Sequence, residues 1–477
     1  MSNNTFYASL LVLGGVAFSA HPLNAMTLTE YLKEVENSSL TYKGAKAQAE
    51  GSQLVSREAD LLTTPRFFMN LRTSYDEKIG TPPMKIYDEM KTHTVGVGVS
   101  QTFDFGLDLK FSYNFNKYNL LGYNPASEGK YWDASPSVEF TMPLWAGGFG
   151  ALVKAQKELT KKQNEADAYQ NTALSLQTIT EAENTYYSLA LARERVKNNE
   201  KSLASGRNIY SYVNSQKNKN LGEAADVLQA RALVEAYELQ LLQARNEVER
   251  LERMFNKYLN KDSSADVPAL EEVNYQTLKV LSISKERPGD RYDVLAQKAQ
   301  LDLSRASSNL LLERNKPQLN LAGGFTLQGR DQKFGEASSN AFDNDKSAGY
   351  VALQFNVPLN FQALSDVRAG ANRLKDAADI REANVNYIQD MDWIDLREKL
   401  LEAQSSLDLT LKMEAAQRAK LENERVRLRQ GRTTTYQVLL FEQDYSNAQS
   451  QTLQVANQII ALKSQANLYI GAPRGDK

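Results

Sequence analysis

The chain has 477 residues, a formal net charge of −2 and no cysteine. Without cysteine there are no disulfides, thiolate metal sites or cysteine nucleophiles, and near neutrality gives no strong attraction for nucleic acid. Only two histidines occur, His21 and His93, although histidine is the usual general base and metal ligand. Composition therefore argues against an enzyme, a resident cofactor and a nucleic-acid partner.

The first element in chain order is a short apolar segment from Phe6 to Ala20. Leu23-Asn24-Ala25 offers a cleavage site before Met26, so residues 1–25 are predicted to be a signal peptide. A transmembrane anchor is the alternative, but the segment is shorter than the roughly 20 residues that span a bilayer. We therefore expect the mature chain to be exported.

A helix and a group of strands are predicted next. Residues 26–64 have apolar positions at helical spacing, Thr27 or Thr29 caps the start, and Pro65 ends the helix. Residues 65–145 then alternate between apolar and polar side chains with aromatic residues near the strand ends, in segments at 66–75, 93–103, 107–118 and 137–144. Strands of about 9–11 residues with one apolar face are typical of outer-membrane barrels. A soluble hairpin is the alternative.

A long helical hairpin follows. From about residue 149 to residue 219 there is no proline, which predicts a helix near 70 residues and about 105 Å long. Gly222 is predicted to end it as a left-handed cap. The returning helix, 224–260, carries two apolar series at heptad spacing, which predicts a buried seam: Val227, Val234, Leu241, Val248, Phe255, and Ala230, Tyr237, Ala244, Leu251, Tyr258.

The same order of elements then repeats. The returning helix of the second copy, which follows Gly431, carries both series in register, so that Val438 matches Val227. The first copy has an extra predicted hairpin near 93–118, and the Gly/Ser/Asn/Asp-rich stretch 329–347 is predicted to be a loop. The predicted segments are 1–25 (signal peptide), 26–64 (helix), 65–145 (strands), 146–260 (helical hairpin), 261–287 (irregular connector), 288–316 (helix), 317–359 (strands), 360–470 (helical hairpin) and 471–477 (tail).

Several short motifs in this order resemble the TolC-like outer membrane efflux family. They lie at helix starts, strand ends and glycine turns: Leu28-Thr29, Tyr31-Leu32, Pro65, Met142-Pro143-Leu144-Trp145-Ala146-Gly147-Gly148, Arg287-Pro288, Pro317, Gly222 before Asp226-Val227-Leu228-Gln229-Ala230, and Gly431 before Gln437-Val438-Leu439. Together with the duplication, they cover nearly all of the mature chain.

The resemblance implies an α+β membrane protein that forms a homotrimer. Its strands form one shared β-barrel in outer-membrane lipid, and a long periplasmic α-helical barrel continues it. Such proteins are exit ducts for tripartite efflux or type I secretion, with a periplasmic adaptor and a proton-driven or ATP-driven inner-membrane pump. The family's barrel has twelve strands; the extra hairpin would give eighteen, or would lie outside the wall. The competing hypothesis is an exported periplasmic coiled-coil scaffold without pore activity.

The resemblance also implies that the two glycine turns form the closed periplasmic mouth. The expected gate residues are Asp226, Gln437, Leu440 and Arg432, with Arg432 paired to Asp226 or Glu223. In the second copy, Gln437 and Leu440 stand where the family usually has aspartates, so we expect weak cation binding. For Asp226 and Arg432 the alternative role is to complement helix dipoles. The expected adaptor contacts are Leu221, Gly222, Glu223, Gly431, Arg432 and Thr433.

Overall fold

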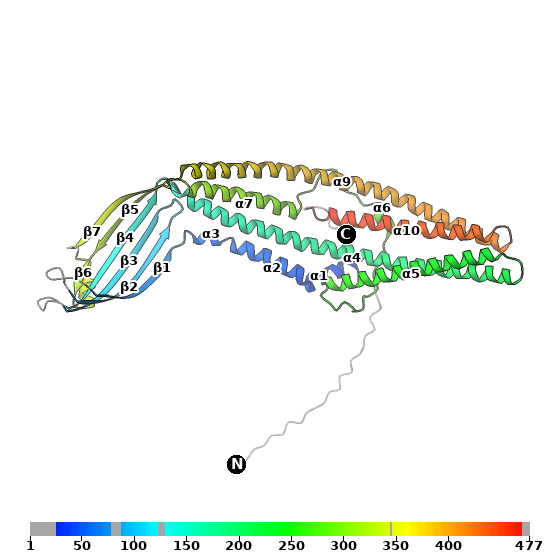
Figure 1. Ribbon diagram of the computed structural model, residues 1–477, viewed down its shortest axis with the longest axis horizontal. Coiled ribbons are helices and arrows are strands. Elements are labelled where there is room, and N and C mark those ends of the chain that lie inside the picture. The colour runs from blue at the N-terminus through cyan, green and yellow to red at the C-terminus, as the bar shows by residue number, and fades with distance from the viewer. Residues whose placement is uncertain (1–24, 78–86, 123–128, 344–345, 470–477) are drawn as a thin grey trace, which may run out of the picture. The chain divides into compact units, whose positions relative to one another are not determined.

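The computed structural model describes residues 25–77, 87–122, 129–343 and 346–469 (Figure 1). The predicted signal peptide up to Asn24 and the predicted tail 471–477 lie outside these residues. The chain divides into two compact units. The helical unit comprises Met1–Tyr42, Thr178–Ile283 and Glu398–Gln465, and the sheet unit comprises Lys43–Gln177, Ser284–Arg397 and Ala466–Lys477.

The sheet unit contains one antiparallel sheet, in which the described residues form seven strands. The order is β1-β2-β3-β4-β5-β7, and short β6 also pairs with β4. The predicted extra hairpin, β2–β3, therefore lies inside the sheet between β1 and β4. The strands are β1 (Arg66–Glu77), β2 (Glu89–Thr102), β3 (Asp108–Leu121), β4 (Lys130–Pro143), β5 (Gln318–Leu327), β6 (Gly329–Asp331) and β7 (Ser347–Asn356).

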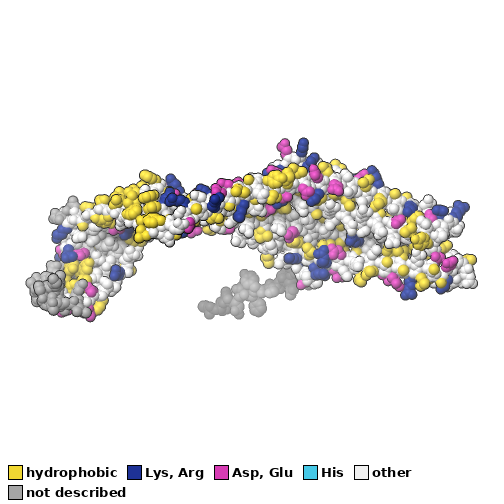
Figure 2. All heavy atoms as spheres, turned by 45° about the horizontal axis from the view of Figure 1, so that its top comes forward, with side chains coloured by type: hydrophobic (Ala, Val, Ile, Leu, Met, Phe, Trp, Pro, Cys, Tyr) yellow, Lys and Arg dark blue, Asp and Glu magenta, His cyan; other side chains and the backbone are white. Residues whose placement is uncertain are grey.

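The alternation of side chains gives the sheet one apolar face and one polar face. On the apolar face, cross-strand partners include Phe67, Val99, Phe111, Val138 and Phe325. On the opposite face, the partners one residue along are polar, for example Ser100, Lys110 and Glu139. Many apolar-face side chains are exposed, and hydrophobic side chains gather over the strands in Figure 2.

Two predicted boundaries in this sheet were wrong. β4 begins at Lys130 rather than near residue 137, because its first half pairs with the far half of β3. The stretch 329–347 is not a plain loop, because it contains β6 and α8 (Phe334–Asn340). Ala337 and Ala341 are buried there, and this burial orders a segment whose composition favours turns.

Four helical columns run from this sheet within the sheet unit. They are α2 (Leu40–Val55) with α3 (Glu58–Leu61), the first part of α4 (Ala151–Asn218), which follows turn η1 (Gly148–Gly150), then α7 (Tyr292–Arg314), and the first part of α9 (Phe361–Arg429). Ion pairs join each column to the next: Lys161–Asp60 at 3.4 Å, Lys162–Asp302 at 3.0 Å and Arg305–Asp379 at 2.8 Å. The columns therefore stand in the order α3, α4, α7, α9.

The helical unit contains the rest of the helices. They are α1 (Leu28–Ser38), the second part of α4, α5 (Ala224–Tyr258), α6 (Tyr275–Lys279), the second part of α9, and α10 (Thr435–Ala466). Thr27 caps α1 through a reciprocal capping box with Glu30. The core packs Tyr31 of α1 against Tyr186 of α4 and Phe255 of α5. Among the described residues, none of the helices is long and apolar enough to cross a membrane.

The heptad seams predicted for the two returning helices are buried or half-buried. In α5 the buried positions are Ala230, Tyr237, Leu241, Ala244, Leu251 and Phe255. In α10 they include Val438, Ala448, Ile459 and Leu462, each less than 9% exposed. Each helix thus buries an apolar stripe and leaves polar residues between, as a helix in a multi-helix wall requires.

Candidate functional site: the turns and the space between the hairpins

The two turns of the helical unit connect α4 to α5 and α9 to α10. In the second turn Gly431 has a φ of 70°, the left-handed conformation expected of a glycine cap. In the first turn the left-handed residue is Asn220, with a φ of 58°, so the prediction for Gly222 was wrong. Asparagine tolerates this conformation because its short polar side chain bonds locally.

The expected adaptor contacts differ in exposure. Leu221 is 74% exposed, which is unusual for leucine. The other residues of this set are exposed except Thr433, which is half-buried: Gly222, Glu223, Gly431 and Arg432. The Thr433 hydroxyl is close to Glu424, and Arg427 donates to the same carboxylate at 3.0 Å. The Glu424 side chain is only 7% exposed, and its bond with Thr433 fixes the second turn against α9.

An apolar cluster behind the turns joins the two hairpins. We call it the turn cluster; it consists of Ile209 and Val213 of α4, Ala230 of α5, Leu421 of α9, and Val438 and Leu439 of α10. Val227 packs against it. Asp226 and Gln437 each precede a residue of this packing, so the structure brings both expected gate residues to the same end of the hairpins. Leu440 is 38% exposed beside them.

The expected pairing of Arg432 is not formed within one chain. Across the described residues, no ion pair joins Arg432 to Asp226 or to Glu223. Its backbone carbonyl instead accepts a hydrogen bond from Arg427 at 3.3 Å. Arg432 is exposed and is free to meet another molecule.

A polar group that sequence reasoning missed lies next to the turn cluster. Arg425 of α9 pairs with Glu442 of α10, and the Ser205 hydroxyl of α4 bonds to both. We call these three residues the Arg425 cluster. The Glu442 side chain is 2% exposed and that of Arg425 is 40% exposed. Burial, followed by the nearby Glu442 carboxylate, raises the pKa of Tyr237. The Arg425 cluster thus ties the second hairpin to the first.

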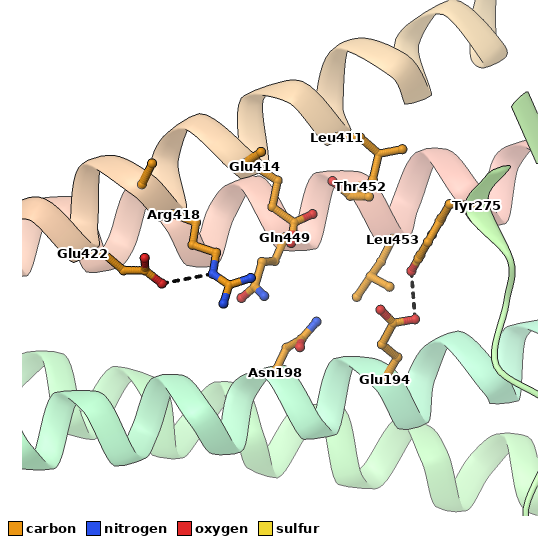
Figure 3. Close-up of a pocket in the computed structure, with 12 residues that line it drawn as sticks. Glu194, Asn198, Tyr275, Leu411, Glu414, Arg418, Glu422, Gln449, Thr452 and Leu453 are labelled. Carbon is orange, nitrogen blue, oxygen red and sulfur yellow. Dashed lines mark hydrogen bonds and ion pairs between the residues drawn. The ribbon is translucent and has the colours of Figure 1, made fainter.

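Two cavities that share lining residues lie between the hairpins. The larger, about 910 Å³, is lined by the Arg425 cluster and by Arg418 and Glu422 of α9. The smaller, about 350 Å³, shares Arg418 and Glu422 and is lined also by Glu194 of α4 and Tyr275 of α6 (Figure 3). The larger cavity is also lined by Ile209, Leu421 and Val438, so the open space between the hairpins reaches the turn cluster.

The smaller cavity holds a half-buried carboxylate. The Tyr275 hydroxyl donates to Glu194 at 2.8 Å. Burial raises the pKa of Glu194; Glu272 and Glu414 add to this, whereas Tyr275 and Lys197 oppose it. On the other wall Arg418 pairs with Glu422 at 3.1 Å (Figure 3). Tyr275 thus anchors the predicted connector, which contains α6, to α4.

The same connector is tied to α9. Lys279 pairs with Asp408 at 2.8 Å, and Gln404 donates to the Leu281 carbonyl at 2.8 Å. The ammonium groups of Lys279 and Lys412 lower the pKa of Asp408 to about 2. No cluster of His, Cys, Asp and Glu in the described ranges has the arrangement of a metal site. The arrangement offers a gap between the two hairpins.

Comparison with known proteins gives a match in structure rather than in sequence. No protein-family model matches the chain. No curated protein matches it either.

Solved structures of outer-membrane proteins match nearly the full length. VceC from Vibrio cholerae has a TM-score of 0.64 at 15% identity, over 92% of this chain and 94% of its own. The outer-membrane channel OprN has a TM-score of 0.63 at 18% identity, over 92% of this chain and 89% of its own. The CmeC channel of Campylobacter jejuni has a TM-score of 0.62 at 15% identity, over 100% of this chain and 96% of its own. The chain has the α+β fold of the TolC-like outer membrane channels, with long helices and antiparallel strands.

Proposed function

We propose that this protein is the outer-membrane exit duct of a tripartite efflux or type I secretion system. In this proposal it forms a homotrimer in the outer membrane, its helices extend into the periplasm, and it meets a periplasmic adaptor and an inner-membrane pump. The full-length match to outer-membrane channels carries the proposal. The sheet and the helical columns supply independent physical support.

The first support is that the sheet has two open edges. β1 lies at one edge and β7 at the other, and both leave backbone groups unpaired within the described chain. Every neighbouring pair in the sheet is antiparallel. With six strands in the path, β1 and β7 run in opposite directions, so β1 of one chain suits β7 of the next. Three chains would close a barrel of eighteen strands, an even number as such barrels require.

The second support comes from matching circumferences. Eighteen strands spaced about 4.8 Å apart and tilted about 40° give a barrel about 113 Å around. Three chains contribute twelve helical columns, and at about 9.5 Å each these give a wall about 114 Å around. Twelve strands at the same tilt would give only about 75 Å. Six strands per chain therefore suit four helical columns per chain.

The third support is the polarity of the sheet. Its apolar face has exposed side chains such as Phe67 (73%), Leu71 (69%) and Val351 (77%). Exposed apolar area on this scale is costly in water and is what hydrocarbon requires. We assign this face to the lipid and the polar face, with Lys110 and Glu139, to the lumen.

We further propose that the turns form the closed periplasmic mouth. Its gate residues are Asp226, Gln437, Leu440 and Arg432, and its adaptor contacts are Leu221, Gly222, Glu223, Gly431, Arg432 and Thr433. Opening requires the hairpins to part at the turn cluster and at Ser205–Arg425, since these contacts join them. The MtrE channel, a protein of this fold, is known in an open state.

Single-channel recording of the purified protein in planar bilayers tests the proposal. A duct gives discrete conductance steps and heat-modifiable migration in detergent, whereas a coiled-coil scaffold gives neither. The mouth is tested by Gln437→Asp/Leu440→Asp. We expect divalent cations added from the periplasmic side to block this double variant strongly and the parent weakly. Strong block of the parent would refute the assignment of an apolar and amide gate.

A further inference from the structure

The segment between β5 and β7 folds back over the sheet. Its helix α8 places the Phe334 ring 4.9 Å from Phe115 of β3 and 5.3 Å from Trp132 of β4. The Tyr113 hydroxyl lies 2.6 Å from that of Ser338. The Phe342 ring is 6.0 Å from Tyr113. α8 is therefore packed on the sheet and does not project from its end.

The face that α8 covers is the apolar one. Tyr113 pairs with Val97 in the ladder, Val97 pairs with Met69, and Phe115 pairs with Val95. Side chains directly opposite each other in a ladder share a face. α8 thus lies on the face that the proposed function assigns to lipid, not on the face assigned to the lumen.

The polarity of this face changes at the level of α8. The residues paired across the strands with Phe115 are apolar. Two residues farther along the strands, on the same face, the paired residues are Thr73, His93, Lys117 and Trp132. Ionised side chains are expensive in hydrocarbon, so the apolar layer ends between these two rows. Phe334 contacts one residue from each row, Phe115 and Trp132, and so lies at the boundary.

The exposed groups of α8 and of the residues that follow it are also mixed in character. Phe334 is 47% exposed and Phe342 is 61% exposed. Beside them Lys333 and Glu336 form an exposed ion pair at 2.8 Å. Exposed aromatic rings next to charged groups are typical of segments that lie at a membrane–water interface.

We propose that α8, with Phe334 and Phe342, is a lipid-docking surface on the outside of the barrel, seated at the headgroup level of the outer leaflet. This inference rests on the proposed function, because it takes the apolar face to be in the membrane. The occupant is lipid: its upper acyl chains and glycerol or sugar region contact the two phenylalanines. The parts of the strands beyond the residues paired with Lys117 then extend past the bilayer.

The chain has no cysteine, so single cysteines report position directly. Phe342→Cys is labelled with an environment-sensitive fluorophore, and the trimer is reconstituted in vesicles that contain nitroxide lipids labelled near the headgroup or deep in the acyl chain. Val351→Cys on the apolar face and Asn70→Cys on the polar face are the matched controls. We expect shallow nitroxides to quench position 342 most, deep nitroxides to quench position 351 most, and aqueous iodide alone to quench position 70.

Quenching of position 342 by iodide alone would overturn the inference, because α8 would then face water. A second variant replaces 333–343 by a short glycine-serine linker, and its conductance is measured. We expect an unchanged open-channel conductance; an increase of about twofold or more would place α8 in the lumen and also overturn the inference. Loss of conductance steps in every labelled protein would instead count against the proposed duct.

Discussion

Arg425→Ala removes the cation that compensates Glu442, and this makes it the most informative substitution near the turns. The Glu442 side chain is 2% exposed, so its carboxylate is largely desolvated and depends on Arg425 for compensation. Ser205 remains as its hydrogen-bond donor. Because Ser205 belongs to α4 whereas Arg425 and Glu442 belong to α9 and α10, the loss also loosens the contact between the hairpins.

The expected loss in free energy of unfolding differs between the substitutions of Arg425 and Glu442. Removing one member of a buried pair typically costs about 3–5 kcal/mol, which we expect for Arg425→Ala in each chain. Glu442→Ala leaves a guanidinium that is already 40% exposed, so we expect the loss of charge-assisted hydrogen bonds only, about 1.5–3 kcal/mol. The double variant should be more stable than Arg425→Ala alone, because no uncompensated buried charge remains.

Urea unfolding of the trimer at fixed protein concentration measures these differences in free energy, and bilayer recording measures the closed-state conductance. Arg418→Ala is the matched control. It lies two turns away on α9, and its pair with Glu422 has side chains 67% and 58% exposed. Such a pair contributes about 0.3–0.5 kcal/mol. We expect the closed-state conductance to rise in Arg425→Ala and to stay unchanged in the control.

Equal effects of Arg425→Ala and Arg418→Ala would refute the reasoning. So would a double variant that loses the sum of the two single losses, since Arg425 and Glu442 would then act independently. A destabilised Arg425→Ala trimer whose conductance is unchanged would limit the cluster to a role in stability.

Further predictions concern the second turn and two carboxylates. Gly431→Ala should destabilise by about 1–2 kcal/mol in urea unfolding because φ is 70° there. Gly222→Ala lacks that backbone strain, although its Cβ would lie 3.3 Å from the backbone nitrogen of Lys217, so we expect a smaller loss than at Gly431. Asp408 has its folded pKa lowered to about 2, so its stabilisation is present above its unfolded pKa and is lost as pH falls through about 2. Asp408→Asn should therefore flatten the acid limb of a plot of unfolding midpoint against pH. The pKa of Glu194 is raised in the folded protein. Its protonated form therefore stabilises the fold at low pH, and this stabilisation is lost as pH rises through the folded pKa. Glu194→Gln should remove this pH-dependent loss, and an unchanged pH profile would contradict the assignment.

Periodicity predicted the parts of the fold that depend on burying one face. The heptad series anticipated that Ala230, Tyr237 and Leu251 are buried, because a stripe at that spacing has to be covered. Strict alternation likewise anticipated β2 and β3. Both patterns repeat over many residues, so a single exception does not obscure them.

Features that depend on one contact were missed. Glu442 follows Phe441 within an apolar stripe, and nothing in the spacing shows that Arg425, 17 residues earlier, lies across the turn from it. Asn220 took the left-handed position because the turn reverses before Gly222, a detail of local geometry. In α8 the small and turn-forming residues outweighed the signal of Phe334, Ala337, Ala341 and Phe342, whose helical spacing was present in the sequence.

The central claim, that three chains share one barrel by pairing β1 with β7, is tested most directly by cross-linking. Arg72→Cys in β1 is combined in turn with Ala348→Cys or Ala352→Cys in β7, and bismaleimide is added to membranes. We predict a ladder of covalent species that ends at the trimer. The control, Arg72→Cys with Ser112→Cys in the interior strand β3, should give no link between chains. Monomer alone in both β7 pairs, or a ladder that continues beyond three chains, would contradict the account.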